Sequence, residues 1–325
     1  MAMGNNKKGI AVAGTILVDK INEISAYPQS GELTQILNVQ KAVGGCVPNV
    51  GIDLKKICPD IDILAIGKVG DDEDGAFLTS VLKSENLDVS GISVSKTEKT
   101  SFTDVMSITG GQRTFFTYAG ASAKFGVEDI DFENINPKIL HLAYFLLLEK
   151  VDNGDGIKIL QKAKEKGIKT SIDLVSENSD RYSLVLPCLP YTDYLIINEL
   201  EAGKLTGIEP TNENLQKIAY KLKELGVKEK VVIHKPDCSV CLSDSGFSRL
   251  PSYSLPNGYI KGTTGAGDAF CAGVLVGIYK GLNDIEIMEF ASACAVMALG
   301  STDATGGLKT EAEIKEFCKG FNRMK

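Results

Sequence analysis

The feature that most constrains the fold of this chain is a regular alternation of strand-like apolar runs with amphipathic helical segments. The pattern predicts strands at residues 9–14, 61–69, 139–142, 169–174, 194–198 and 230–234. It predicts helices at residues 49–57, 74–85, 154–166, 212–225, 266–280 and 284–298. Strands and helices that alternate at this spacing form βαβ units. We therefore expect a doubly wound, mostly parallel sheet with helices on both faces, and ligands outside the carboxyl ends of its strands.

Two segments interrupt this alternation, at about residues 15–43 and 98–119, because neither has a helical period. The second contains two strand-like runs around Gly110-Gly111, which is typical of a β-hairpin. Both segments leave the α/β core beside the expected ligand loops. We expect them to form one small β-sheet lid on a single domain of residues 1–325. Two independent surface hairpins are the alternative.

Composition narrows the class of partner and the compartment. The net charge of −7 argues against nucleic acid and against an anionic membrane surface as the main partner. No apolar run reaches membrane-spanning length, and the first ten residues lack the apolar region of a secretory signal. Eight scattered cysteines fit small buried hydrophobes in a reducing compartment. We expect a soluble, cytoplasmic protein.

One cysteine pair has the spacing of a metal or redox motif, Cys238 and Cys241. A zinc site would need a second pair of ligands, and the chain has only two histidines, His141 and His234. The pair also lies in a strand-like run. We interpret its spacing as coincidental.

The most specific motif is Gly-Thr-Thr-Gly-Ala-Gly-Asp at residues 262–268, directly before a helical apolar pattern. Small residues let backbone N–H groups at a helix N-terminus approach an anion, and the helix dipole favours negative charge there. Asp268 in such a cradle is better explained as a proton acceptor than as a packing residue. With a nucleotide's phosphates near residues 265–267, it would deprotonate an alcohol that attacks the γ-phosphate. An acidic first helical turn is the alternative.

Three weaker motifs lie upstream. Asp19 follows the first strand, where a carboxylate can accept hydrogen bonds from two sugar hydroxyls, although a solvated loop acid is the alternative. The paired glycines Gly44 and Gly45 would let a ligand lie against the backbone, and Asn49 would recognise hydroxyls; a glycine turn with a helix-capping Asn is the alternative. Asn198 and Glu201 start the helix after a strand, where they would organise hydrated Mg²⁺ or simply cap the helix.

These motifs occur in the order found in the PfkB (ribokinase-like) carbohydrate kinases, which the chain resembles over nearly its whole length. Residues 119–123, Ala-Gly-Ala-Ser-Ala, resemble the substrate-side segment of that family, and residues 303–308 resemble its C-terminal loop. The resemblance implies a doubly wound α/β core with a β lid. It also implies ATP-dependent phosphorylation of a hydroxymethyl group on a sugar or sugar-like substrate, with Mg²⁺ as the metal.

The resemblance assigns a role to each matching position. It implies that Asp268 is the catalytic base and that the anion hole is formed by Gly265, Ala266 and Gly267. It implies that ATP and Mg²⁺ are bound by Asn198, Glu201 and Thr264, with Glu201 reaching the metal through water. The substrate-binding set that it implies is Asp19, Gly44, Gly45, Asn49 and Thr117.

Two positions depart from the family pattern. Gly262 stands where most members have an Asp that helps to hold K⁺ in the members that use a monovalent cation. Its presence argues against K⁺ activation, although backbone carbonyls would still contribute. Pro236 replaces part of a glycine-bearing turn against the nucleotide and removes a backbone donor, so that contact must differ. Lys235 would supply charge there or simply be solvated.

Alternative functions follow from other features. A nucleoside kinase of the same fold is one, because lid aromatics would stack on a base: Phe102, Phe115, Phe116 and Tyr118. A non-catalytic sugar or nucleotide sensor is another, motivated by the two departures. A dehydrogenase is excluded, because no G-x-G-x-x-G follows the first strand. A homodimer that pairs through the lid sheet stays open.

Overall fold

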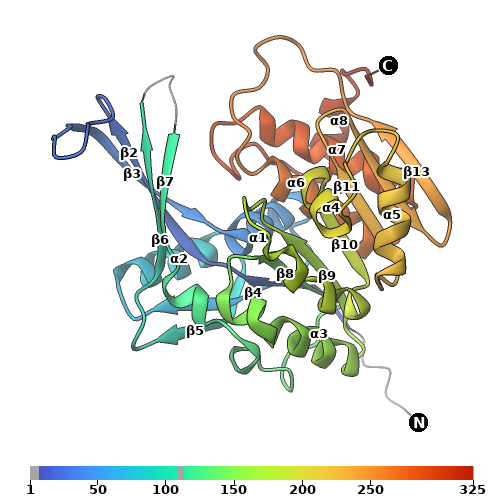
Figure 1. Ribbon diagram of the computed structural model, residues 1–325, viewed down its shortest axis with the longest axis horizontal. Coiled ribbons are helices and arrows are strands. Elements are labelled where there is room, and N and C mark those ends of the chain that lie inside the picture. The colour runs from blue at the N-terminus through green and yellow to red at the C-terminus, as the bar shows by residue number, and fades with distance from the viewer. Residues whose placement is uncertain (1–6, 109–112, 325) are drawn as a thin grey trace.

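A nine-stranded sheet crosses the centre of the computed structural model, which describes residues 7–108 and 113–324 (Figure 1). Its strand order is β13-β12-β11-β10-β9-β8-β1-β4-β5. From β11 to β5 all neighbours are parallel, and β12 and β13 extend one edge as antiparallel strands. The bounds are β1 Ile10–Gly14, β4 Ile63–Gly70, β5 Asp88–Ser95, β8 Ile139–Phe145, β9 Lys169–Leu174, β10 Tyr194–Asn198, β11 Lys230–His234, β12 Cys238–Ser243 and β13 Gly246–Pro251.

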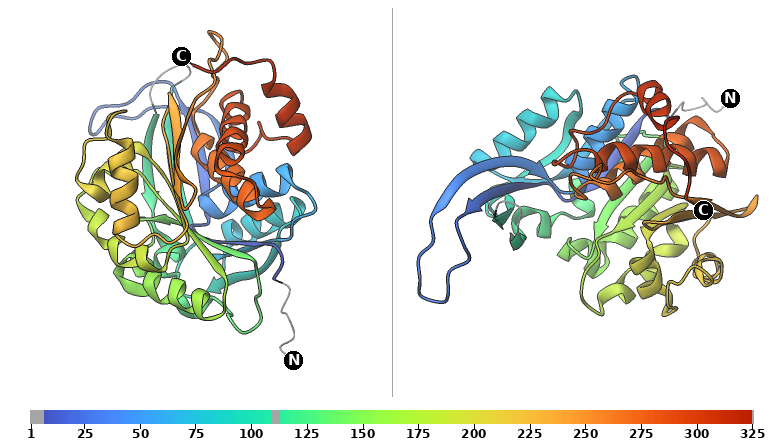
Figure 2. Two further views of the ribbon diagram at one scale, coloured as in Figure 1. Left: turned by 90° about the vertical axis from the view of Figure 1, so that its right-hand side faces the viewer. Right: turned by 90° about the horizontal axis from the view of Figure 1, so that it is seen from above.

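Helices cover both faces of this sheet (Figure 2, left). One face packs against α1 Cys46–Ile57, α2 Glu73–Ser84, α6 Ala266–Lys280, α7 Asp284–Leu299 and α8 Glu311–Cys318. The other packs against α3 Gly156–Glu165, α4 Glu199–Thr206 and α5 Leu215–Glu224. Shorter helical turns lie in the connections, at Gly120–Lys124, Val127–Asp129, Val151–Asp155, Arg181–Leu184 and Leu186–Tyr191.

Side chains of β1 show how this arrangement follows from strand geometry. Ile10 and Val12 belong to the core beneath the first group of helices, whereas Ala11 and Ala13 belong to the core beneath the second. Successive side chains of a strand point to opposite faces, so a strand covered on both sides must be apolar throughout. The predicted doubly wound α/β fold is confirmed.

The structure differs from the sequence expectation at several element ends. The helix expected at 49–57 begins earlier, at Cys46, and the strand expected at 139–142 continues to Phe145. The pattern does not predict β5 and β13, which form the two edges of the sheet. Both strands are partly exposed and therefore lack the continuous apolar run that marks a buried strand.

A second sheet of four strands projects from the main body, at the left of Figure 1. Its order is β3-β2-β6-β7, with β2 Leu17–Ile24, β3 Ile36–Gly44, β6 Ser101–Ser107 and β7 Arg113–Tyr118. Strand β2 pairs in parallel with β6, so the two interrupting segments form one sheet and the alternative of independent hairpins is wrong. The turn expected at Gly110-Gly111 lies outside the described residues.

The chain path creates a crevice at the centre of the main sheet. From β1 the chain builds outward through β4 and β5 on one side, and it returns to β8 on the other side of β1. The strand order therefore reverses between β1 and β8. Ligands of doubly wound sheets bind at such a switch point, outside the carboxyl ends of the strands.

The cysteines agree with the sequence interpretation. All eight cysteines are buried and unpaired. Cys238 and Cys241 lie on β12 and contribute to the cores on opposite faces of the sheet, so they do not converge on one metal. Within residues 7–108 and 113–324, no helix has both the length and the apolar character needed to cross a membrane.

Gly45 offers a test of how α1 is placed. Its φ is 89°, and a Cβ there would lie 2.5 Å from the carbonyl oxygen of Thr15, which also accepts a hydrogen bond from Val47 N–H. The ψ of Gly45 is 164°, in a region nearly restricted to glycine. Gly207 has a φ of 68° and a ψ of 17°, in the left-handed helical region, with no atom within 4 Å of its Cβ position. Positive φ alone costs about 1–2 kcal/mol for alanine. We therefore expect Gly45→Ala to lower the free energy of unfolding at least twice as much as Gly207→Ala.

Denaturant unfolding of both variants measures this difference. Equal losses would show that the close approach of Gly45 to Thr15 does not constrain the start of α1.

Candidate active site

The N-terminus of α6 carries the most specific motif. Gly265 has a φ of 80°, and a Cβ there would lie 2.3 Å from the carbonyl oxygen of Ala304, so only glycine fits. The Ala266 N–H donates to the Thr263 carbonyl at 3.3 Å. Within the described part of the chain, the N–H groups of Gly267 and Asp268 make no hydrogen bond. These two N–H groups are therefore the ones that the helix N-terminus offers to an anion.

Asp268 follows in the first turn of α6 and is buried, with 7% of its surface exposed. Asn49 Nδ2 donates to its Oδ2 at 2.9 Å. The Tyr144 hydroxyl donates to Oδ1 at 3.0 Å and to Oδ2 at 3.1 Å. Burial raises the pKa of Asp268 to about 7, the negative charge of Asp173 adds to the shift, and the two donors oppose it. The carboxyl group thus exchanges a proton near neutral pH.

A bulge in β8 directs Tyr144 toward Asp268. The pairing of β8 with β9 shifts register between Leu142 and Phe145, and Tyr144 has a φ of 61°. Its backbone N–H donates to Asp173 Oδ1 at 2.7 Å. Positive φ in a bulky residue is strained, and bulges next to functional sites re-aim side chains. The sequence analysis missed Tyr144 and Asp173, because neither belongs to a motif; their place at strand ends was the only signal.

Asn198 and Glu201 join the end of β10 to the start of α4. Asn198 Oδ1 accepts from Glu201 N–H at 3.0 Å, and Glu201 Oε2 accepts from Asn198 N–H at 3.1 Å, so the helix-capping arrangement is present. Ser176 Oγ donates to Glu201 Oε1 at 2.9 Å. Burial raises the pKa of Glu201 to about 7. A cation beside Glu201 would favour its charged form.

One cavity of about 210 Å³ collects these motifs at the carboxyl ends of the strands. It brings together five of the residues expected from the sequence: Asn198, Glu201, Gly265, Gly267 and Asp268. It adds others that the sequence analysis did not assign to the site, including Tyr144, Asp173, Ser176 and His234. Ala266 and Thr264 do not line it, and Thr264 is exposed in the loop before α6.

The expected substrate-binding residues lie outside this cavity, mostly on the small sheet. Asp19 is on β2, and a Cβ on Gly44 would lie 2.4 Å from Asp19 Oδ2, so the glycine leaves room for the carboxylate. Burial raises the pKa of Asp19 to about 6. The strand register aligns Asp19 with Thr103 and Thr103 with Thr117, whose hydroxyl oxygens are 3.3 Å apart. Residues aligned across a sheet share a face, so Asp19 and Thr117 face the same way.

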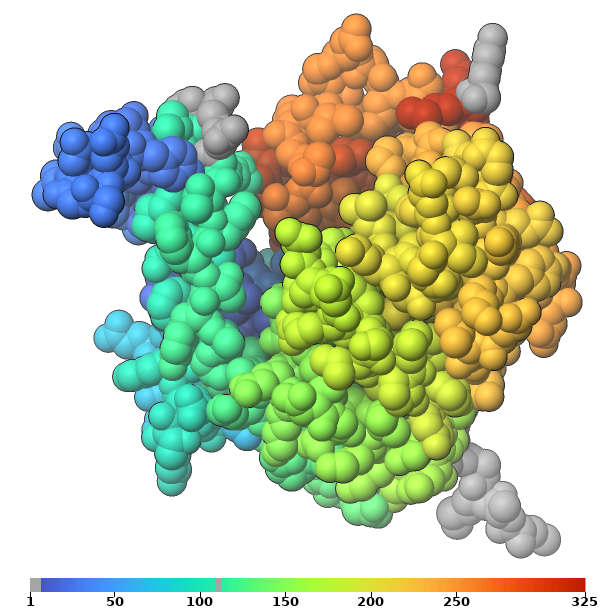
Figure 3. Space-filling model, viewed as in Figure 1, coloured from blue at the N-terminus to red at the C-terminus, as the bar shows by residue number. Residues whose placement is uncertain are grey.

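Asn49 connects the two groups of residues. It lies in the first turns of α1, where Gly45 starts the helix, and is buried, with 6% of its surface exposed. Its Nδ2 holds Asp268, but its Oδ1 is buried with no hydrogen-bond partner among the described residues. A buried unpaired amide oxygen is unfavourable, and a ligand hydroxyl would satisfy it. Figure 3 shows the surface hollowed between the small sheet and the main body.

The structure shows the surroundings of the two positions that depart from the family pattern, Gly262 and the turn at Pro236. A Cβ on Gly262 would lie 2.9 Å from the Ser301 carbonyl oxygen, so the backbone approaches closely where the family has a side chain. After β11, Lys235 Nζ donates to Asn212 Oδ1 at 2.9 Å and pairs with Asp237 at 3.1 Å. The ammonium group of Lys235 is therefore bound by Asn212 and Asp237 of its own chain. Burial lowers the pKa of His234 to about 4, which keeps this cavity residue neutral.

Comparisons with known proteins agree on one family. The model of the pfkB family carbohydrate kinases matches residues 8–311. A 5-dehydro-2-deoxygluconokinase of Clostridium perfringens is 26% identical over 298 residues, which cover 88% of this chain and 87% of that protein. A fructokinase of Zea mays is 25% identical over 96% of this chain and 98% of its own length.

Solved structures support the fold. The ribokinase of Arabidopsis thaliana, solved with ribose and ATP, superposes with a TM-score of 0.84 at 23% identity. The superposition covers 96% of this chain and 99% of that one. A ribokinase of Thermotoga maritima superposes with a TM-score of 0.80 at 21% identity, over 96% of this chain and 99% of its own.

The buried charge of Asp268 predicts a pH-dependent stability. Its pKa is 3.8 in the unfolded chain and about 7 in the folded one, so from pH 4 to pH 7 the folded state holds a proton that the unfolded state releases. The stability of the wild type therefore falls as pH rises through this window. Asn at this position stays neutral. We expect Asp268→Asn to exceed the wild type in stability by a margin that grows between pH 5 and pH 8, up to about 4 kcal/mol.

Urea unfolding at four pH values in that range measures the margin. A margin that does not change with pH would contradict the raised pKa of Asp268.

Proposed function

Because the chain belongs to the pfkB family of carbohydrate kinases, we propose that it transfers the γ-phosphoryl group of ATP to a hydroxymethyl group of a sugar or sugar-like substrate. One observation carries this proposal. The carboxylate of Asp268 is buried at a helix N-terminus and is hydrogen-bonded to Asn49. Among the described residues, neither Asn49 Oδ1 nor the N–H groups of Gly267 and Asp268 have a hydrogen-bond partner. The proton acceptor Asp268, the anion site at the start of α6 and the hydroxyl acceptor Asn49 are therefore adjacent to one another.

Asp268 acts as the general base in this proposal. With a pKa of about 7, it accepts the proton of the substrate hydroxyl at physiological pH, and such assistance is worth about 10²–10⁴-fold. Asn49 and Tyr144 hold the carboxylate and favour its charged form. The N–H groups of Gly267 and Asp268 stabilise the charge on the transferred phosphoryl group.

Glu201 and Asn198 fit a hydrated Mg²⁺, because this ion keeps several waters and takes few protein oxygens. Bound Mg²⁺ would neutralise charge on the phosphates of ATP. Glu201 is held by Ser176 and by the Asn198 backbone, so its carboxylate is fixed at the cavity wall and available to order metal-bound water. Thr264 stays a proposed contact of the ATP side.

The substrate would lie between the small sheet and Asp268. Asp19 accepts hydrogen bonds from its hydroxyls, Gly44 and Gly45 allow it to lie against the backbone, and Thr117 adds a hydroxyl from the same face. Closure of the small sheet as a lid would exclude water, so that the substrate hydroxyl attacks instead. The names of the relatives suggest a sugar acid, fructose and ribose as the first candidates.

A nucleoside kinase is the alternative. The strand register reduces the number of aromatic side chains that could stack on a base. Tyr118 aligns with Phe102, with ring centroids 5.3 Å apart, on the face of the small sheet opposite Asp19. Phe115 aligns with Val105 on the same face as Asp19, and 62% of its surface is exposed. Of the four expected aromatics, only Phe115 shares a face with Asp19, which supports it as the residue that would stack on a base in this alternative.

Three further expectations stay proposals. With Gly262 against the Ser301 carbonyl, we expect activity that does not require K⁺. The eight unpaired thiols fit a reducing compartment, which suggests the cytoplasm. Exposed apolar residues on the edge strand β3, Ile36, Leu37 and Val39, would suit a homodimer that pairs through the small sheets.

A coupled ADP-release assay tests the reaction. The panel contains ribose, fructose, 5-dehydro-2-deoxygluconate, adenosine and inosine, each with MgATP and with or without K⁺. We expect turnover with one of the sugars or the sugar acid, and a loss of at least 100-fold in kcat for Asp268→Asn with nucleotide binding retained. Asp284→Asn, an acid in the first turn of the neighbouring helix α7, serves as the control and should keep kcat.

Turnover of the nucleosides alone would favour the alternative. Saturable ligand binding without ADP release across a broad panel would favour the non-catalytic sensor over the kinase. An Asp268→Asn variant with more than about a tenth of wild-type kcat would exclude the base.

Tyr144 should set the pH dependence of the reaction. Because Asp268 must be deprotonated to act, kcat/KM should fall as pH drops below about 7. The Tyr144 hydroxyl favours the charged carboxylate, so Tyr144→Phe should raise the pKa of Asp268 and move this acidic limb upward by roughly 0.5–1 unit. Profiles of kcat/KM between pH 5 and pH 9 measure the shift. If the acidic limb of the profile stayed at the same pH or moved to lower pH, Tyr144 would not set the pKa of Asp268.

A further inference from the structure

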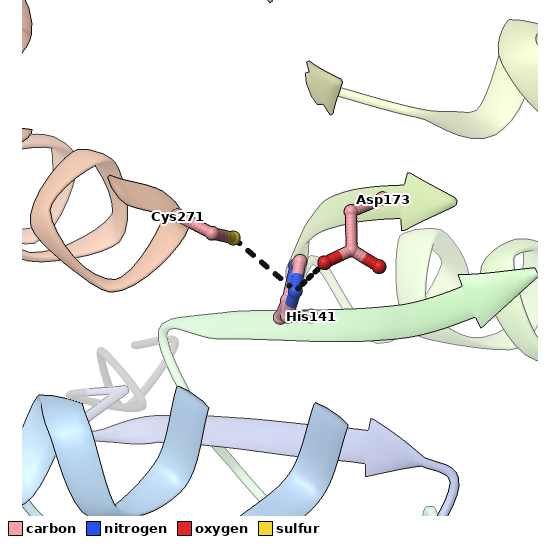
Figure 4. Close-up of side chains that lie close together, drawn as sticks. All are labelled: His141, Asp173 and Cys271. Atoms are coloured by element: carbon pink, nitrogen blue, oxygen red, sulfur yellow. Dashed lines mark hydrogen bonds and ion pairs between the residues drawn. The ribbon is translucent and has the colours of Figure 1, made fainter. Parts of the chain in front are cut away.

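Three side chains with different donor atoms meet behind the wall of the cavity: His141 on β8, Asp173 on β9 and Cys271 on α6 (Figure 4). His141 Nε2 lies 3.4 Å from Cys271 Sγ and 3.4 Å from Asp173 Oδ2. All three residues are buried, and their donor atoms lie within 4.8 Å of one another. Asp173 and Cys271 also line the cavity, which gives the cluster a path to solvent.

Two of the three separations between these atoms match the edges of a zinc coordination tetrahedron, and the third is bounded at 4.8 Å. Zn²⁺ binds imidazole nitrogen at about 2.0–2.1 Å, thiolate sulfur at about 2.3 Å and carboxylate oxygen at about 2.0–2.2 Å. At tetrahedral angles these bond lengths place neighbouring donor atoms about 3.4–3.6 Å apart. Both separations from His141 Nε2 already agree with that value. Binding would therefore require little movement of the imidazole.

We propose that His141, Asp173 and Cys271 form a binding site for Zn²⁺ or a similar divalent transition metal, whose fourth coordination position opens into the cavity. Imidazole, thiolate and carboxylate all bind Zn²⁺ in proteins, because this ion is borderline in softness. Mg²⁺ prefers oxygen ligands in octahedral geometry, so the metal of the kinase reaction does not compete for this site.

The neighbouring groups orient the ligands. Ser171 Oγ lies 3.0 Å from His141 Nδ1, so this hydroxyl can accept the Nδ1 proton and leave the Nε2 lone pair for the metal. The Tyr144 N–H binds Asp173 Oδ1 and leaves Oδ2 toward His141. His141 and Asp173 therefore each have a hydrogen-bond partner that orients them toward the proposed metal.

The electrostatics of the cluster favour a cation. Burial holds the pKa of the Cys271 thiol well above its usual range, and the charges of Asp173 and Asp268 add to this effect. The same negative potential attracts a divalent ion. When the ion binds, Cys271 loses its proton to solvent and the thiolate becomes a ligand, since a bound metal overrides the raised pKa.

Occupancy of this site would change the electrostatics of the proposed base. Cys271 lies one helical turn after Asp268, so the bound ion adds positive charge close to the proposed base. That charge lowers the affinity of the carboxylate for a proton. The ion also occupies the wall of the cavity in which Asp268, Asn198 and Glu201 meet.

Co²⁺ absorption tests the site without nucleotide or sugar, so its outcome is independent of the proposed reaction. Metal-free full-length protein is titrated with Co²⁺ in excess Mg²⁺. We expect a thiolate-to-Co²⁺ charge-transfer band in the near ultraviolet that saturates at one equivalent and disappears when Zn²⁺ is added. Cys271→Ser should abolish the band. Cys294→Ser, which alters another fully buried helical thiol, should keep it.

A second variant and a second readout support the assignment. His141→Gln should weaken Co²⁺ binding by at least about 100-fold, and Zn²⁺ should raise the Tm of the wild type but not that of Cys271→Ser. Absence of the band in the folded wild type would overturn the proposal, whatever the variants do. A band of equal strength in Cys271→Ser would also overturn it.

Discussion

The carboxylate of Asp268 is buried where the strand order of the main sheet reverses, and the surroundings of this one group explain much of the site. Burial and the charge of Asp173 oppose its ionisation, whereas Asn49 and Tyr144 donate hydrogen bonds that favour it. These opposing effects leave its pKa near neutrality. Each partner comes from a different element, α1, β8 and β9, so the proton affinity of Asp268 depends on how the whole centre of the sheet is assembled.

Close backbone approaches make that assembly possible. Gly45 lies against Thr15, Gly265 against Ala304 and Gly44 against the Asp19 carboxylate, each at a distance that excludes a Cβ. These contacts bring the small sheet, α1 and the C-terminal loop toward the start of α6. The bulge in β8 completes the arrangement, because it turns Tyr144 into the crevice and leaves its N–H to hold Asp173. The backbone strain at Tyr144 is thus tied to the position of two polar side chains.

The cluster of His141, Asp173 and Cys271 belongs to the same crevice. Asp173 is shared: one oxygen binds the Tyr144 backbone, and the other faces the imidazole. A ligand that binds this cluster would therefore act on the proposed base through a common neighbour. This arrangement would couple occupancy of the metal site to the protonation of Asp268 without any change of fold.

Local pattern was enough to predict the doubly wound sheet, the segments of the small sheet and the motif before α6, because apolar periodicity and glycine spacing depend on neighbours in the sequence. The edge strands β5 and β13 were not predicted, because they are partly exposed and lack a continuous apolar run. The chain order of the motifs also identified the family. Tyr144, Asp173 and the partners of His141 required the tertiary structure, since each acts through a residue distant in sequence. The same holds for the pKa of Asp268: the sequence determined which acid stands at the helix N-terminus, and only packing decided how strongly it is desolvated and which donors reach it.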